Sequence, residues 1–171
     1  MAGMDPVIRG ERPSDVAAIH AVTAAAFRDA PHADHTEQFV VDALRRAGAL
    51  ALSLVAERAG EVVGHVAVSA VRISDGAVGW FGLGPISVRP DLQGQGIGSL
   101  LMQEALRRLR AKGAAGCVVL GDPAYYGRFG FRPEPGLFLR GVPPAYFQAL
   151  AFGAAVPRGE VAYHEAFNVR G

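Results

Sequence analysis

The residues with the clearest chemical use form a glycine-rich segment, residues 93–99, in which Gly94, Gly96 and Gly98 alternate with other residues. The segment follows a run of strand-forming residues and precedes apolar residues at helical spacing. The first turn of a helix carries free backbone N–H groups and the positive end of the helix dipole, and glycine lets a phosphate approach these donors closely. The segment therefore predicts an anion-binding loop at the start of a helix.

Two familiar phosphate-binding motifs do not fit this loop. A P-loop requires Lys followed by Ser or Thr after its second glycine, and this loop lacks that pair. A dinucleotide fingerprint requires the spacing G-x-G-x-x-G within a βαβ unit, whereas Gly94, Gly96 and Gly98 are evenly spaced. A glycine-rich helix start that binds no ligand is the remaining structural interpretation.

A second motif, Tyr-x-x-x-Gly-Phe, runs from Tyr126 to Phe131 and follows another apolar run, residues 117–120, after a short interval. Residues 93–98, Gln-Gly-Gln-Gly-Ile-Gly, resemble the pyrophosphate-binding motif of the GNAT superfamily of N-acetyltransferases, and the Tyr126 motif resembles a second motif of that family. Both stand in the family's order, and the resemblance covers essentially the whole chain. Residues 120–131 and 161–167 are similar to a bacterial subgroup of predicted acetyltransferases.

The resemblance implies a site for acetyl-CoA, the cosubstrate of this family. In the family, backbone amides of the loop hold the pyrophosphate of coenzyme A, and the preceding strand binds the pantetheine arm through its own backbone. The cofactor-binding residues implied here are Ile86, Ser87, Val88, Gln93, Gly94, Gln95, Gly96, Ile97, Gly98, Ser99, Asp122 and Tyr126.

Acyl transfer to an amine also needs a donor for the developing oxyanion and a proton or contact for the leaving thiolate. The resemblance implies the backbone N–H of Val88 as the oxyanion donor. It implies Tyr126 as the acid, with Tyr125 as its competitor; a packed aromatic side chain is the alternative role for Tyr126. No covalent intermediate on the protein is required.

One departure from the family concerns the residues before Tyr126. Many members have an asparagine about seven residues before this tyrosine, on a longer helix, that binds pantetheine. Here the interval is short and offers Asp122. Either Asp122 takes part of that role or the contact is absent.

The general base and the acceptor site are less defined. Glu37, His65 and Asp122 are the candidate bases, and each is also an ordinary surface or packing residue by type. Trp80 and Phe81 precede the expected bend of a strand, where we expect the acceptor amine to arrive; an aromatic pair on a strand is more often part of a core, which is the alternative.

The pattern of apolar residues predicts the elements that must position these groups. Glycine and proline at Gly82, Gly84 and Pro85 predict a bend in the strand before the loop. Residues 97–111 form an amphipathic helix that ends near Gly113. The expected strands are residues 7–10, 50–57, 62–71, 78–88, 117–121 and 161–169, the last closing the sheet, and the other expected helices follow Ser14 and run over residues 39–47.

This order is also that of the family, so the resemblance implies an α+β fold of layered α/β type. We expect a mixed, mostly antiparallel central sheet that is splayed at the cofactor site and has helices on both faces. Residues 5–171 are expected to form a single domain, preceded by an N-terminal tail of residues 1–4.

Composition excludes several function classes. A formal net charge of +1 is too small for a general electrostatic attraction to nucleic acid or anionic lipid. No apolar run reaches the roughly 18 residues of a membrane span, and the N-terminus lacks a secretory pattern, so we expect a cytoplasmic protein. The single Cys117 lies in an apolar run, and His32 and His35 lack a third ligand, so no metal site is expected.

These inferences favour an N-acetyltransferase that acts on a primary amine of a small molecule or a protein, as a monomer or a homodimer. The alternative from another class is a sensor that holds coenzyme A or an acyl-CoA without turnover. The Tyr126 motif favours the enzyme, because a sensor needs no acid.

Overall fold

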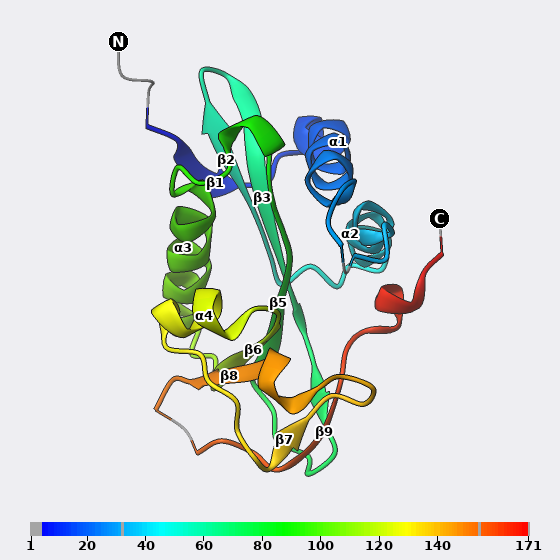
Figure 1. Ribbon diagram of the computed structural model, residues 1–171, viewed down its shortest axis with the longest axis vertical. Coiled ribbons are helices and arrows are strands. Elements are labelled where there is room, and N and C mark those ends of the chain that lie inside the picture. Colours follow the sequence, from blue (N-terminus) through cyan, green and yellow to red (C-terminus); the bar gives the residue numbers. More distant parts are fainter. Residues whose placement is uncertain (1–4, 32, 154, 171) are drawn as a thin grey trace.

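The computed structural model describes residues 5–31, 33–153 and 155–170. The expected N-terminal tail, residues 1–4, and His32 lie outside these ranges. A six-stranded sheet with the order β1-β2-β3-β5-β6-β8 forms the centre of the molecule (Figure 1). Its strands are β1 (Val7–Gly10), β2 (Leu52–Arg58), β3 (Glu61–Ala70), β5 (Trp80–Val88), β6 (Gly116–Leu120) and β8 (Phe147–Ala151).

Helices cover both faces of this sheet. The helices α1 (Val16–Phe27) and α2 (Glu37–Arg46) lie on one face, and α3 (Ile97–Ala111) lies on the other (Figure 1). The apolar side of α3 is buried against the sheet, as its sequence period predicts. Its buried residues are Ile97, Leu101, Met102, Ala105, Leu106 and Leu109.

The strands expected at residues 50–57 and 62–71 are observed as β2 and β3, which form a hairpin. Arg58 pairs with Glu61, so only two residues make the turn. Ala59 and Gly60 both have positive φ, 53° and 79°, which is the requirement of a turn whose twist matches the two strands. This hairpin places β3 next to β5, the strand that leads to the glycine-rich loop.

The sheet is splayed beside this loop, which confirms the expected bend and the predicted fold class. The strands β5 and β6 are the parallel pair of the sheet, and they pair only from Trp80 to Gly82 on β5 and from Gly116 to Val118 on β6. Beyond Gly82, β5 continues to Val88 with β3 as its partner on the other side. One edge of β5 therefore faces a gap, which we call the splay.

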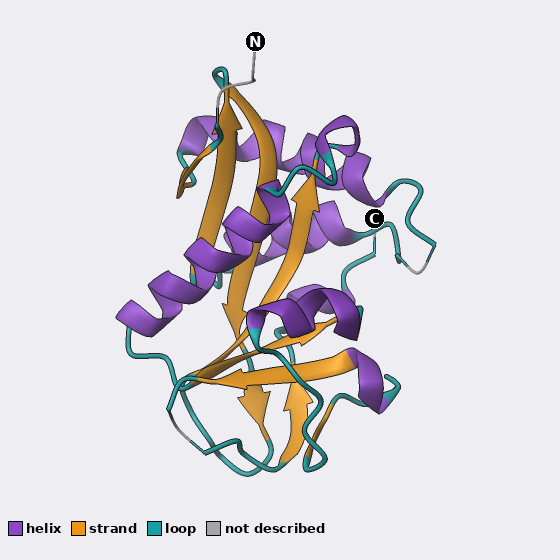
Figure 2. Cartoon of the chain, turned by 60° about the vertical axis from the view of Figure 1, so that its left-hand side comes forward, coloured by secondary structure: helices purple, strands orange, loops and turns teal. Residues whose placement is uncertain are grey.

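Residues 161–169 were expected to close the sheet, and this prediction is wrong. The closing strand is β8, which pairs antiparallel with all of β6. The strand β9 (Gly159–Ala162) instead joins β4 (Arg72–Ile73) and β7 (Leu137–Phe138) in a small second sheet at one end of the molecule (Figure 2). After β9 the chain turns into a short 3-10 helix at residues 165–168, which contacts α2.

Among the described residues, no helix combines the length and the apolar character needed to cross a lipid bilayer.

Candidate active site

A cleft of about 450 Å³ opens beside the glycine-rich loop. Its walls come from the loop, from the last residues of β5, from the end of α1 and from the segment after β6. Its lining residues are Ala26, Phe27, Ala30, Ile86, Ser87, Val88, Leu92, Gln93, Gly94, Gly96, Ile97, Gly98, Ser99, Tyr125 and Arg128. Nine of the twelve predicted cofactor-binding residues are in this wall; Gln95, Asp122 and Tyr126 are not.

The loop presents backbone donors to the cleft. Gly94 and Gly96 have φ of 80° and 88°, a conformation that L-residues with side chains adopt only with strain. Gly96 is the N-cap of α3 and no side chain caps the helix, so its first N–H groups have no partner within the helix. An added Cβ at Gly96 would meet no atom within 4 Å, so the backbone is open to a close ligand.

The edge of β5 adds a second row of backbone donors. The Arg89 N–H donates to the Val63 carbonyl at 2.8 Å on β3. Along an antiparallel pair, the backbone N–H groups of successive residues point alternately towards and away from the partner strand. The Ser87 N–H therefore also points towards β3, whereas the N–H groups of Ile86 and Val88 point into the splay. The Val88 carbonyl accepts a hydrogen bond from the Gln93 side chain at 3.0 Å, which ties the strand to the loop.

The two adjacent tyrosines occupy different places. Tyr125 lines the cleft, and its hydroxyl lies 3.0 Å from where a Cβ on Gly98 would be. Tyr126 packs beneath it into the core around α3, edge-on to Phe131. Burial raises the pKa of Tyr126 to about 12, with a further contribution from Tyr125, so its hydroxyl stays protonated at neutral pH.

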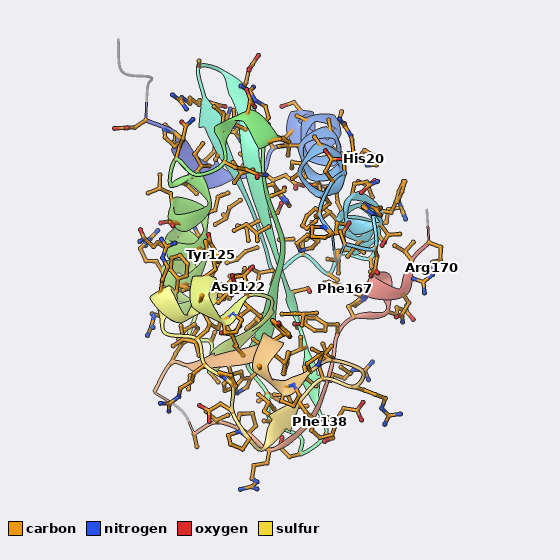
Figure 3. All side chains as sticks on the ribbon, in the orientation of Figure 1. His20, Asp122, Tyr125, Phe138, Phe167 and Arg170 are labelled. Carbon is orange, nitrogen blue, oxygen red and sulfur yellow. The ribbon has the colours of Figure 1, made fainter. Side chains whose placement is uncertain are left out.

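Asp122 does not reach the cleft. It is the N-cap of the single turn α4 (Pro123–Tyr126), where its carboxylate accepts the Ala124 N–H at 2.9 Å. Figure 3 shows Asp122 and Tyr125 at this turn, beside α3. Glu37 is the first residue of α2, and one of its carboxylate oxygens accepts the Asp34 N–H at 3.2 Å.

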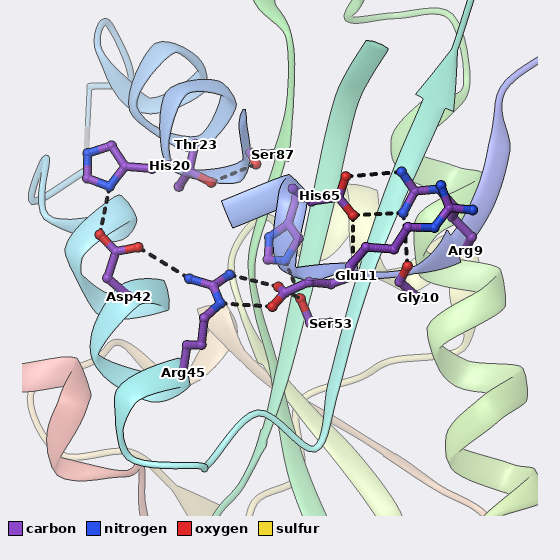
Figure 4. Close-up of polar contacts among 12 residues, drawn as sticks. Arg9, Gly10, Glu11, His20, Thr23, Asp42, Arg45, Ser53, His65 and Ser87 are labelled. Atoms are coloured by element: carbon purple, nitrogen blue, oxygen red, sulfur yellow. Dashed lines mark hydrogen bonds and ion pairs between the residues drawn. The ribbon is translucent and has the colours of Figure 1, made fainter. Parts of the chain in front are cut away.

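His65 is fully buried between β3 and the two helices (Figure 4). Its Nε2 lies 2.8 Å from the Ser53 hydroxyl, which itself donates to Glu11. Because the Ser53 hydroxyl donates its proton to Glu11, it can only accept from His65, so Nε2 must carry the imidazole proton. Nδ1 is then an unprotonated acceptor that has no hydrogen-bond partner among the described residues. Burial lowers the pKa of His65 to about 4, so the ring is neutral near pH 7.

Glu11 joins this histidine to helix α2. It forms two hydrogen bonds with Arg45, at 2.7 and 2.8 Å, and Arg45 also reaches Asp42 (Figure 4). Burial alone would raise the pKa of Glu11, but the hydrogen bonds from Arg45 and Ser53 lower it below its ordinary value. These contacts fix α2 on the sheet and lie outside the cleft wall.

Arg128 is a cleft residue that the sequence analysis did not identify. Its guanidinium donates to the Ser99 hydroxyl at 3.2 Å and lies 5.3 Å from the centre of the Tyr125 ring. It occupies a variable position of the Tyr126 motif, which is the only signal for it in the sequence. The cleft residues from α1, such as Phe27, give no such signal because they meet the loop only after folding.

The expectation that Trp80 meets the acceptor amine is wrong. Its side chain is 2 % exposed and belongs to the core around Val118 and Phe147. An added Cβ on Gly116 would overlap the Trp80 ring, so this glycine makes room for the indole. Phe81 is half-buried and packs against the other core, around α3.

The splayed sheet and the glycine-rich helix start define a class of proteins that hold a phosphate-bearing ligand against a strand edge. The family model for the acetyltransferase (GNAT) domain matches residues 50–133. The uncharacterized N-acetyltransferase YhbS of Escherichia coli is 37% identical over 169 residues, which are 95% of this chain and 98% of that protein. The chain belongs to the GNAT family of acetyltransferases.

Two solved structures extend the comparison to the fold. A GNAT family acetyltransferase from Brucella melitensis in complex with acetyl-CoA is 53% identical, with a TM-score of 0.85 over 95% of this chain and 97% of that one. YhbS from Escherichia coli in complex with CoA has a TM-score of 0.87 at 35% identity, over 100% of this chain and 96% of that one. Both structures contain the ligand class that the cleft predicts.

Proposed function

We propose that this chain transfers an acetyl group from acetyl-CoA to a primary amine of a small molecule or a protein, by direct attack within a ternary complex. Residues 5–171 act as one acetyltransferase domain. The observation that carries the proposal is that the open helix start at Gly96 and the outward N–H groups of Ile86 and Val88 lie in the wall of one cleft.

Two parts of acetyl-CoA, the pyrophosphate and the pantetheine arm, have matching features in this cleft. The pyrophosphate binds the N–H groups of the loop, aided by Arg128, whose charge favours an anion. The pantetheine arm lies along β5, where Ile86 and Val88 offer hydrogen bonds that β6 leaves unused. The fit is supported by Gly96, where a side chain would fill the space next to these donors.

The reaction requires a neutral amine to attack the thioester carbonyl. The N–C bond forms, the C–S bond breaks, and the amine gives up one proton. The Val88 N–H stabilises the developing oxyanion, and Ile86, which points the same way two residues along, is its competitor for this role. Holding the amine and the thioester together removes much of the entropic cost of their encounter.

Tyr126 acts on the leaving sulfur as a hydrogen-bond donor. Its pKa is about 12, whereas a thiol has a pKa of roughly 8.5. Proton transfer from Tyr126 to the thiolate would therefore cost about 5 kcal/mol of free energy. The hydroxyl therefore stabilises the thiolate in the transition state, and the proton that completes the thiol comes from the amine through water. No carboxylate or imidazole is among the described residues that line the cleft, which supports water as the first proton acceptor.

The test measures binding and turnover separately. Calorimetry with CoA and acetyl-CoA reports the cofactor site, and thiol release from acetyl-CoA over a panel of primary amines reports transfer. We expect binding of both ligands and thiol release with at least one amine. Tight binding without release over a broad panel would favour the sensor, and absence of binding would refute both functions.

A further inference from the structure

The closed end of the splay is built around Gly82. Gly82 is the last residue of β5 that pairs with β6, opposite Val118. The cleft wall described above ends on β5 at Ile86 and does not include Gly82. The strand between these two residues therefore runs from the open cleft to the point where the sheet becomes continuous.

The Tyr163 ring covers Gly82. An added Cβ on Gly82 would overlap the Tyr163 ring at Cε1, so only glycine leaves room for this contact. Tyr163 follows β9 and packs against Phe167, with ring centres 4.9 Å apart. Figure 3 places Phe167 on the C-terminal segment beside the central sheet. The ring is thus held by a segment far from β5 in the sequence.

The Tyr163 side chain also packs against the core that contains Val118, the partner of Gly82 on β6. Burial raises the pKa of its hydroxyl, and the neighbouring Cys117 and Tyr126 raise it further. Cys117 belongs to β6, and Tyr126 packs into the core around α3 on the other side of the sheet. Tyr163 and Tyr126 therefore pack against the two different cores of the sheet, and Tyr126 lies at Gly121, beyond the paired end of β6.

A polar group without a partner lies at the same place. Ser69 on β3 is the cross-strand partner of Gly82, and directly opposed residues share a face of the sheet. Its side chain is 0% exposed, and its hydroxyl has no hydrogen-bond partner within the described ranges. An apolar acyl chain would offer that hydroxyl no partner either, so the polar group gives such a chain no favourable contact at this position.

We propose that Tyr163 closes the acyl end of the cofactor cleft and restricts the enzyme to short acyl chains. The proposal rests on the proposed function, because it requires the cofactor to lie along β5 with its phosphates at the loop. The acyl group, at the far end of pantetheine, then points from Ile86 towards Gly82. This arrangement places the thioester carbonyl at the Ile86 N–H, since Ile86 is nearer Gly82 along β5 than Val88 is. The acetyl methyl group then points towards the Tyr163 ring without reaching it, and a longer chain collides with the ring.

The test compares binding of CoA, acetyl-CoA, butyryl-CoA and hexanoyl-CoA by calorimetry, which needs no acceptor amine. For the unchanged protein we expect affinity relative to CoA to fall as the chain lengthens. Tyr163→Ala should improve binding of butyryl-CoA relative to acetyl-CoA by about tenfold or more, since a few methylenes in a pocket are worth at least that. Tyr163→Phe keeps the ring and should keep the original chain-length profile.

Two controls make the outcome decisive. Tyr146→Ala removes a tyrosine that is 48% exposed outside the cleft wall and should change nothing. If Tyr163→Ala does not fold, Tyr163→Leu, which fills part of the site, is measured in its place. An unchanged chain-length profile in a folded variant that binds CoA normally would overturn the proposal, whereas failure of the unchanged protein to bind CoA would refute the proposed function itself.

Discussion

At the scale of single residues, the cleft separates two adjacent tyrosines into two environments. Tyr125 lies at the loop, next to Gly98, whereas Tyr126 is packed below it against Phe131. Their sequence positions differ by one, so the motif alone left them as competitors. In the proposed function, these different depths assign Tyr125 to the phosphate end of the cofactor and Tyr126 to its sulfur end.

Tyr126→Phe should reduce turnover about 10²-fold and leave CoA affinity nearly unchanged, because it keeps the ring packing and removes only the hydrogen-bond donor to the developing thiolate. Tyr125→Phe is the matched variant, and we expect it to alter CoA affinity more than turnover. Thiol release with an identified amine, under conditions where chemistry is rate-limiting, measures both. A full rate in Tyr126→Phe would assign this residue a purely structural role.

Arg128→Ala should weaken CoA binding by about tenfold, since a charged hydrogen bond to phosphate contributes roughly 1.5 kcal/mol or more. The loss should shrink at high salt, which screens exposed charges. Arg132→Ala is the control, because Arg132 is a nearby exposed arginine that pairs with Glu134 and lies outside the cleft wall. Equal losses for the two variants would mean that only the general charge of this surface matters.

At the scale of elements, the sequence predicts those parts of the fold whose signal is local. The helix expected at residues 97–111 is observed as Ile97–Ala111, because a long amphipathic pattern and a glycine stop are both local. The strand β8 was missed, because five residues after a proline-rich stretch carry little signal and their partner, β6, is distant in the sequence. Contacts across the fold, such as Tyr163 on Gly82, leave no local pattern at all.

The helix α3 offers a matched pair of glycines for testing the loop. Gly96 and Gly113 stand near its two ends, both have positive φ, 88° and 81°, and neither has an atom within 4 Å of an added Cβ. Alanine at either position should cost a similar 1–2 kcal/mol of stability through backbone strain. Only Gly96→Ala should lose CoA binding, by calorimetry, because only its Cβ enters the cleft. Comparable affinities in the two variants would contradict the placement of the pyrophosphate.

The strand β3 carries a pH-dependent contribution to stability through His65. Its folded pKa of about 4 lies below its unfolded value of roughly 6.5, so the unfolded chain binds more protons between these values and stability falls as the pH falls through this window. From pH 7 to pH 5 the loss should be about 2 kcal/mol, above the range in which Glu11 titrates. Urea unfolding of the unchanged protein and of His65→Gln at both pH values measures it. The Gln variant should lose most of this dependence, and an equal loss in both proteins would assign it to other groups.

At the scale of the whole molecule, the splay divides one continuous sheet into two parts. One part consists of β1, β2, β3 and β5, and the other consists of β6 and β8. The two parts remain joined by the pairing of residues 80–82 with residues 116–118. In the proposed function, a cofactor along β5 would supply hydrogen bonds where this pairing is interrupted. Its binding should therefore stabilise both parts together rather than one of them.

Saturation with CoA at about 100 times its Kd should add roughly 2.7 kcal/mol to the free energy of unfolding, because the ligand binds only the folded state. For a chain of this size each kcal/mol corresponds to about 2–4 °C, so we expect the Tm to rise by roughly 5–10 °C in a single transition. Calorimetric scans with and without CoA measure the shift, and Gly96→Ala should show none. Two unfolding transitions, of which CoA raises the Tm of only one, would contradict cooperative unfolding of the two parts of the sheet. In that case the short pairing at Gly82 would be too weak to couple the loop side of the cleft to the β6 and β8 side.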